Sequence, residues 1–185
     1  MGYEAALKKS WDDLATVVKD RVEGVVFLGQ KYDVDISSRS IIDVATHSSP
    51  KVYVIIIILH YLLAVHRFGG APEPSGEWIS FNQLDGADAY YPTFKKRTID
   101  ILAGKCSRSF DDLVKKISLL GAERAPHGDA AFIIKPFHNI PVLITLLKGD
   151  DEFAAGAEIH FDRFISKIFC TEDIIVMTEI LVHGL

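Results

Sequence analysis

Apolar residues recur at intervals of three and four in the first part of the chain, which places their side chains on one face of an α-helix. Gly24 follows at a position suited to a helix C-terminus. The sequence therefore predicts an amphipathic helix over residues 3–22. The stripe on its buried face consists of Leu7, Trp11, Leu14, Val18 and Val22.

The spacing of apolar residues then changes to two. Tyr32, Val34 and Ile36 alternate with charged residues, which predicts a strand that is buried on one side. A polar turn over 37–39 leads to a second apolar segment over 41–44. We therefore expect a β-hairpin.

The most apolar segment runs over 52–65 and invites comparison with a membrane-spanning helix. Such a helix needs about 20 apolar residues. This segment is shorter, is interrupted by His60 and follows Lys51. We predict a buried helix at about 51–66 that starts after the Ser-Ser-Pro sequence at 48–50, and no membrane span.

The remaining sequence predicts a mixture of helices and strands. Helical spacing and alternation follow one another without a long polar linker. The expected elements are a strand over 77–81, two helices ending at Gly104 and Gly121, strands over 130–137 and 141–148, a strand through Ile159 and Phe161, and a helix beginning at Thr171.

Length and composition support one α+β domain over residues 1–185, in which helices pack on an antiparallel sheet. The chain has 185 residues, of which 49% are hydrophobic, enough for one core. We expect an N-terminal helix, the buried helix and a C-terminal strand meander. Nothing in the pattern predicts the oligomeric state.

Charge and cysteine content narrow the expected setting. The formal net charge of −5 disfavours nucleic-acid binding, because the densest basic run, residues 95–97, would fan around a helix. Cys106 and Cys170 are too few and too distant for a disulfide framework. The first residues do not form the basic and apolar pattern of an export signal. We therefore expect a cytoplasmic protein.

The sequence carries none of the short motifs that identify nucleotide-binding loops, nucleophile elbows, zinc proteases or EF-hands. These absences favour a protein that is not an enzyme. They do not exclude catalytic residues brought together from distant positions.

One acidic group could support metal-dependent hydrolase or lyase chemistry. Carboxylates near a histidine can hold a divalent cation or transfer protons. The alternative is a solvated turn followed by the wet face of a strand. The candidate metal ligands are Asp150, Asp151, Glu152, His160 and Asp162.

His60 is a second candidate because it interrupts an apolar helix. It could be an axial ligand of a tetrapyrrole such as haem, or a proton carrier. The alternative is a core histidine that bonds a backbone carbonyl.

A third candidate is an aromatic segment over 77–97. Aromatic side chains with a few polar groups are typical of ligand pockets. The alternative is a core with a tyrosine-rich loop. The candidate ligand-binding residues here are Glu77, Trp78, Phe81, Tyr90, Tyr91, Phe94 and Arg97.

Several strings, in order along nearly the whole chain, resemble the prokaryotic family called domain of unknown function 3786. They overlap the aromatic segment and the acidic turn. The strings are Phe27-Leu28-Gly29-Gln30-Lys31-Tyr32-Asp33-Val34-Asp35, Leu59-His60-Tyr61-Leu62-Leu63, Gly76-Glu77-Trp78-Ile79-Ser80-Phe81, Gly128-Asp129-Ala130-Ala131, Gly149-Asp150-Asp151-Glu152-Phe153-Ala154-Ala155 and Thr171-Glu172-Asp173-Ile174.

The resemblance implies an accessory protein from an anaerobe that binds a corrinoid or another bulky cofactor for a partner enzyme. Family members with an additional cysteine-rich module are described as iron–sulfur proteins. This chain has two isolated cysteines, which cannot supply the four thiolates of an ordinary cluster. We therefore expect a cofactor-binding module without an iron–sulfur cluster, with the metal-dependent enzyme and a structural homodimer as alternatives.

Overall fold

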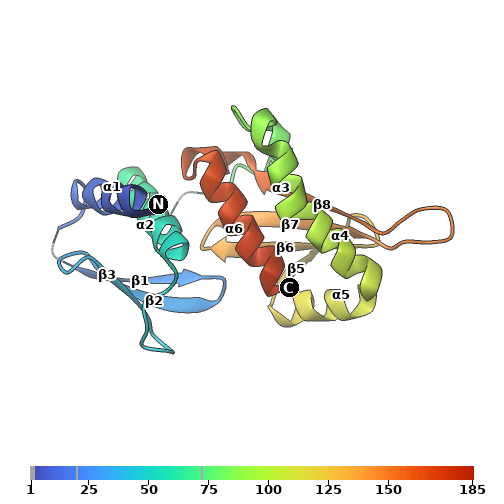
Figure 1. Ribbon diagram of the computed structural model, residues 1–185, viewed down its shortest axis with the longest axis horizontal. Coiled ribbons are helices and arrows are strands. Elements are labelled where there is room, and N and C mark those ends of the chain that lie inside the picture. The colour runs from blue at the N-terminus through green and yellow to red at the C-terminus, as the bar shows by residue number, and fades with distance from the viewer. Residues whose placement is uncertain (1–2, 20, 72) are drawn as a thin grey trace.

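The computed structural model describes residues 3–19, 21–71 and 73–185. The chain forms a single α+β domain with two lobes side by side (Figure 1). One continuous hydrophobic core contains residues from both lobes. No helix among the described residues is long and apolar enough to cross a membrane.

The N-terminal lobe combines a three-stranded antiparallel sheet with two helices that pack on each other. Its sheet has the order β1-β2-β3. The elements are α1 (Tyr3–Ala15), β1 (Val22–Phe27), β2 (Gln30–Asp35), β3 (Ser40–Asp43) and α2 (Val52–Phe68).

The C-terminal lobe contains a five-stranded antiparallel sheet of order β4-β8-β7-β6-β5. Helices α3, α4 and α6 cover one of its faces, and α6 is the helix nearest the N-terminal lobe (Figure 1). The elements are β4 (Trp78–Ser80), α3 (Tyr91–Arg97), α4 (Ile99–Arg108), α5 (Phe110–Leu119), β5 (Glu123–Ala125), β6 (Ala130–Phe137), β7 (Ile140–Leu147), β8 (Gly156–Asp162) and α6 (Thr171–Gly184).

The structure confirms most elements expected from the spacing of apolar residues. The buried helix is α2, the hairpin is β2–β3, and the C-terminal meander is β6–β7–β8. The wet face predicted for β8 is confirmed only in part, since Ile159 and Phe161 are buried and Glu158 is exposed, but His160 is half-buried and Asp162 is buried. Strand β2 was predictable because burial on one face imposes a period of two. Helix α2 and strand β7 are buried at consecutive positions, and their continuous apolar sequence made them predictable.

The N-terminal helix prediction is wrong after Ala15. Gly24 lies inside β1, opposite Asp33, and is not a helix cap. The segment Val22–Phe27 is rich in β-branched residues, and pairing with β2 determines its conformation. Val18 still reaches the core, at 5% exposure, from beyond the helix end.

Two predicted boundaries also differ. Gly104 lies within α4, and the break before the second predicted helix falls at Ser109. The first predicted helix is divided into α3 and α4 at Thr98, whose hydroxyl donates to the Phe94 carbonyl at 2.7 Å. The N-cap of α2 is Lys51, without a side-chain hydrogen bond, so the expected serine cap is absent. Strand β5 had no alternating pattern of its own and was not predicted.

Candidate functional site

The structure places the central aromatic residues of the predicted pocket in the hydrophobic core. Phe81 and Phe94 stack with ring centroids 4.1 Å apart and an interplanar angle of 4°, and both are fully buried. Phe161 of β8 lies against Phe94 at 6.0 Å. These rings fill the core and line neither of the two clefts described below.

The remaining residues of the aromatic segment do not converge. Glu77 forms an exposed ion pair with Arg163, with both oxygens 2.6 Å from guanidinium nitrogens, and this contact lowers the pKa of Glu77. Tyr90 is exposed, while Trp78 and Tyr91 are half-buried. Arg97 alone among the predicted residues of this segment lines a cleft, together with its ion-pair partner on α6.

Two of the predicted metal ligands, Asp150 and Asp162, accept hydrogen bonds from backbone amides. Asp150 accepts hydrogen bonds from the amides of Glu152 and Phe153, at 2.9 and 2.7 Å, and thereby closes the acidic turn. These bonds lower the pKa of Asp150. In the described part of the chain, no group of three or more His, Cys, Asp or Glu side chains is arranged to hold a metal ion.

Asp162 fixes the connection between the lobes. Its carboxylate accepts the amide and hydroxyl of Ser75 at 2.9 Å, the amide of Gly76 at 2.7 Å and the amide of Phe164 at 2.9 Å. Burial opposes ionisation, but these hydrogen bonds outweigh it and lower the pKa of Asp162. The side chain of His160, on the same face of β8, buries an Nδ1 atom that has no partner among the described residues.

His60 lies at a contact between the two lobes. Its Nδ1 is 2.8 Å from Oδ2 of Asp173 at the start of α6, and its Nε2 is 2.8 Å from Oγ of Ser10 on α1. The main chain and thiol of Cys170 also donate to Asp173. The partners of His60 are therefore side chains, and not the backbone carbonyl that the sequence suggested.

The order Ser10–His60–Asp173 is that of a catalytic triad, but the serine is not placed for nucleophilic attack. Ser10 is 2% exposed, and its hydroxyl donates to the Ala6 carbonyl one turn earlier in α1, at 2.8 Å. Both ring nitrogens of His60 are held by side chains, Nδ1 by the Asp173 carboxyl group and Nε2 by the Ser10 hydroxyl. The arrangement is a polar link between α1, α2 and α6.

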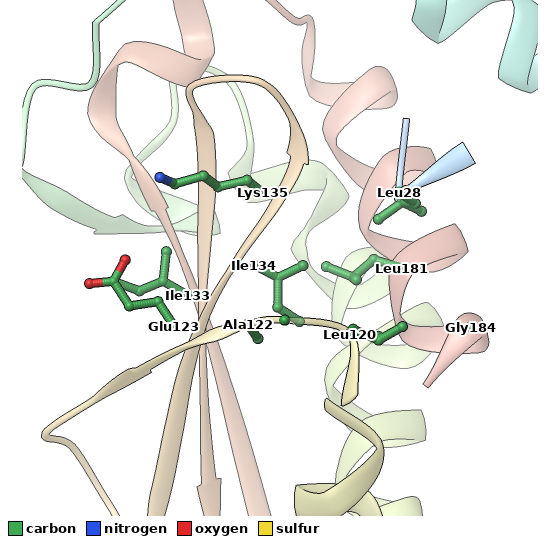
Figure 2. A pocket seen from close by; sticks show the side chains of 11 residues that line it. Leu28, Leu120, Ala122, Glu123, Ile133, Ile134, Lys135, Leu181 and Gly184 are labelled. Atoms are coloured by element: carbon green, nitrogen blue, oxygen red, sulfur yellow. The ribbon is translucent and has the colours of Figure 1, made fainter. Parts of the chain in front are cut away.

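A cleft with a largely apolar lining lies between the lobes, where the β1–β2 turn faces the end of α6 and β6 (Figure 2). Its volume is about 380 Å³. This is within the range of small-molecule sites. The lining residues are Leu28, Gly29, Leu120, Gly121, Ala122, Glu123, Ile133, Ile134, Lys135, Leu181 and Gly184.

Neighbouring side chains of β6 lie on opposite sides of the strand in this cleft (Figure 2). Leu28, Ile134 and Leu181 point toward one another on the side of α6, whereas Lys135 and Glu123 extend on the opposite side (Figure 2). The alternation of neighbouring residues along β6 produces this separation. No ion pair engages Lys135 or Glu123 within the described ranges.

Leu28 adopts a backbone conformation that is unfavourable for its residue type. Leu28 and Gly29 form the two-residue turn between β1 and β2 with φ values of 47° and 80°. Asn, Asp or Gly normally occupies the first of these positions, and a left-handed conformation costs other residues roughly 1–2 kcal/mol. The Leu28 amide donates to the Pro136 carbonyl at 2.8 Å, which holds the turn against β6.

Sequence reasoning did not select this cleft, although the Phe27–Asp35 string of the family resemblance includes Leu28. A leucine at the first position of a tight hairpin turn is the one local signal that could have drawn attention to it.

Comparison with known proteins identifies the family and supplies no activity. Neither the search of curated proteins nor that of solved structures found a match. The model of the family described as domain of unknown function (DUF3786) matches residues 14–184, which includes both lobes except for most of α1. The chain therefore belongs to the DUF3786 family.

Proposed function

We propose that the protein is a binding or accessory module whose ligand lies in the apolar cleft beside Leu28. The observation that carries the proposal is the strained leucine: a bulky apolar side chain occupies a position that favours Asn or Gly, and it faces the cleft. Strain of this kind is concentrated at functional sites. The ligand contact gives a physical reason for retaining leucine there.

The cleft favours a small ligand with an apolar body and a polar end. Leu28, Ile134 and Leu181 supply apolar surface, and about 380 Å³ is near the lower end of small-molecule sites. Lys135 is exposed at the rim, where its ammonium group can contact a polar end without losing its water.

A corrinoid or haem would contact this cleft through only one edge of its macrocycle. His60 is an unfavourable axial ligand, because both ring nitrogens already bond to protein side chains. A bulky cofactor therefore fits the proposal best as a molecule shared with a partner enzyme, with one edge of its ring in the cleft. Both cofactors belong in the binding test.

The test is a titration of the full chain with the neutral fluorescent probe N-phenyl-1-naphthylamine, and separately with cobalamin and haem by absorption. Leu28→Gly removes the side chain from the cleft and accepts the left-handed turn. His47→Gly is the matched control, because His47 has a φ of 53° and lies outside the cleft.

We expect Leu28→Gly to weaken probe binding about tenfold or more, since burying a leucine side chain stabilises a complex by about 1.5–3 kcal/mol. His47→Gly should bind as the parent does. Equal affinity of Leu28→Gly and the parent for every ligand that binds would contradict the proposed site. No binding of any of the three compounds would count against the binding function.

A further inference from the structure

A second cleft, of about 440 Å³, lies on another face of α6. It is bounded by the start of α1, the start of α2, the end of α3 and the second half of α6. Most of its lining residues are polar or charged, whereas most of those in the apolar cleft are apolar. The residues that carry the argument are Tyr3, Lys51, Tyr53, Arg97, Glu179 and His183.

Basic groups outnumber acidic groups in this second cleft. Arg97 forms an ion pair with Glu179, and this hydrogen bond raises the pKa of Arg97. Lys51 has no carboxylate partner among the described residues and lies 5.8 Å from the centroid of the Tyr53 ring. His183 is 58% exposed and lies 3.9 Å from Glu179. Glu172 also acts on Arg97 electrostatically, so Lys51 is the permanent positive charge of the cleft without an ion-pair partner in the described part of the chain.

The backbone adds to this positive character. Lys51 is the N-cap of α2, a helix of 17 residues with no acidic residue in its first turn and no side-chain cap. Free amides at a helix N-terminus favour anions. Two tyrosines, Tyr3 and Tyr53, supply hydroxyl groups and ring faces in the same cleft.

We propose that this second cleft binds a small phosphorylated ligand. The phosphate would contact Lys51 and Arg97, a point charge and a planar guanidinium that line the same cavity. The tyrosine hydroxyls offer hydrogen bonds to the phosphate oxygens. Glu179 orients the Arg97 guanidinium from the side of α6. The site is separate from the apolar cleft and does not depend on the function proposed for it.

The experiment is isothermal titration of the full chain with pyrophosphate in buffer of constant ionic strength. Lys51→Gln removes the unpaired charge at a position without a side-chain capping bond. Lys115→Gln is the matched control, because it removes the same charge from an exposed position on α5 outside the cleft. Arg97→Lys keeps the charge and removes the planar fork.

We expect pyrophosphate to bind the parent, and Lys51→Gln to weaken it about tenfold, as expected for one charged hydrogen bond. Arg97→Lys should weaken binding by a similar factor, and Lys115→Gln should leave it unchanged. The absence of binding to the parent would overturn the proposal, as would equal losses in Lys51→Gln and Lys115→Gln. Probe binding in the apolar cleft should be the same in all three variants.

Discussion

The two clefts use different faces of the same helix. The apolar cleft takes Leu181 and Gly184 from α6 and Leu28 from the N-terminal lobe, whereas the second cleft takes Glu179 and His183 from α6 and Lys51 from that lobe. Both therefore exist only while the lobes are docked. The comparison shows that opposite faces of α6 give the two clefts their different character, because one face presents apolar residues and the other presents polar residues.

The largest effect on stability is expected from Asp162→Asn, which disturbs the connection on which both clefts depend. Replacing a carboxylate that accepts four part-buried hydrogen bonds should cost about 3 kcal/mol of unfolding free energy. Because the pKa of Asp162 is lowered by folding, its contribution is present above the unfolded pKa of about 4 and is lost as pH falls through the folded value. Urea unfolding between pH 7 and pH 3 measures both effects.

In Asp162→Asn, this part of the acid dependence should disappear while the variant remains folded at pH 7. A parent-like stability at pH 7 would contradict the role given to Asp162. An unchanged slope of stability against pH below pH 4 would contradict its lowered pKa.

The next largest effect should come from His60→Ala, which removes the polar link between the lobes. We expect a loss of about 1–3 kcal/mol, because the Asp173 carboxylate remains buried without its partner. Both the naphthylamine probe and pyrophosphate should then bind more weakly. Urea unfolding and the two titrations give the comparison.

His66→Ala is the matched control for this prediction. His66 lies on the same helix and bonds Glu23 at 2.8 Å, but that contact stays within the N-terminal lobe. A similar loss of stability without a loss of binding is expected. If His66→Ala weakened the binding of both ligands as strongly as His60→Ala does, the link between α2 and α6 would not be what maintains the two clefts.

The salt dependence of binding should distinguish the two clefts, with a smaller effect than those of the variants above. Raising sodium chloride from 0.05 to 0.5 M should weaken pyrophosphate binding by about three- to tenfold, because partly exposed charges are screened. Binding of the neutral probe should stay the same or strengthen. Equal salt dependence of both ligands would contradict the assignment of the two to different sites.

The smallest effect concerns the stability of Leu28→Gly. Relief of the left-handed strain offsets the lost packing and the added freedom of glycine, so the unfolding free energy should change by less than about 1 kcal/mol. Urea unfolding at pH 7 measures it. A loss of 2 kcal/mol or more would mean that Leu28 is retained for packing, and the main support for the apolar site would be lost.

Elements whose burial repeats along the chain were predictable from sequence, and contacts between distant segments were not. The spacing of apolar residues placed α2, the meander and the start of α6 correctly. It failed at β1, where pairing with β2 overrides a helical stripe. The spacing of apolar residues alone cannot tell a longer helix from a strand here, because Val18 and Val22 fit the pattern of both.

The candidate sites show the same limit. The aromatic residues at Phe81 and Phe94 have the composition of a pocket, but their rings stack on each other and fill the core. His60 was selected correctly as unusual, yet its partners Ser10 and Asp173 are 50 and 113 residues away in sequence. Arg97 was selected for the aromatic segment and is found beside a cleft that includes the ends of three other helices.

The most direct test of the apolar site is a nuclear magnetic resonance titration of the isotope-labelled full chain with N-phenyl-1-naphthylamine. The account predicts that the amide signals of Gly29, Gly121 and Gly184 shift with one common affinity, because all three line the cleft. The amides of Lys51 and Tyr53 should not move. Shifts confined to the second cleft, or spread evenly over the sheet surface, would contradict the proposed binding site.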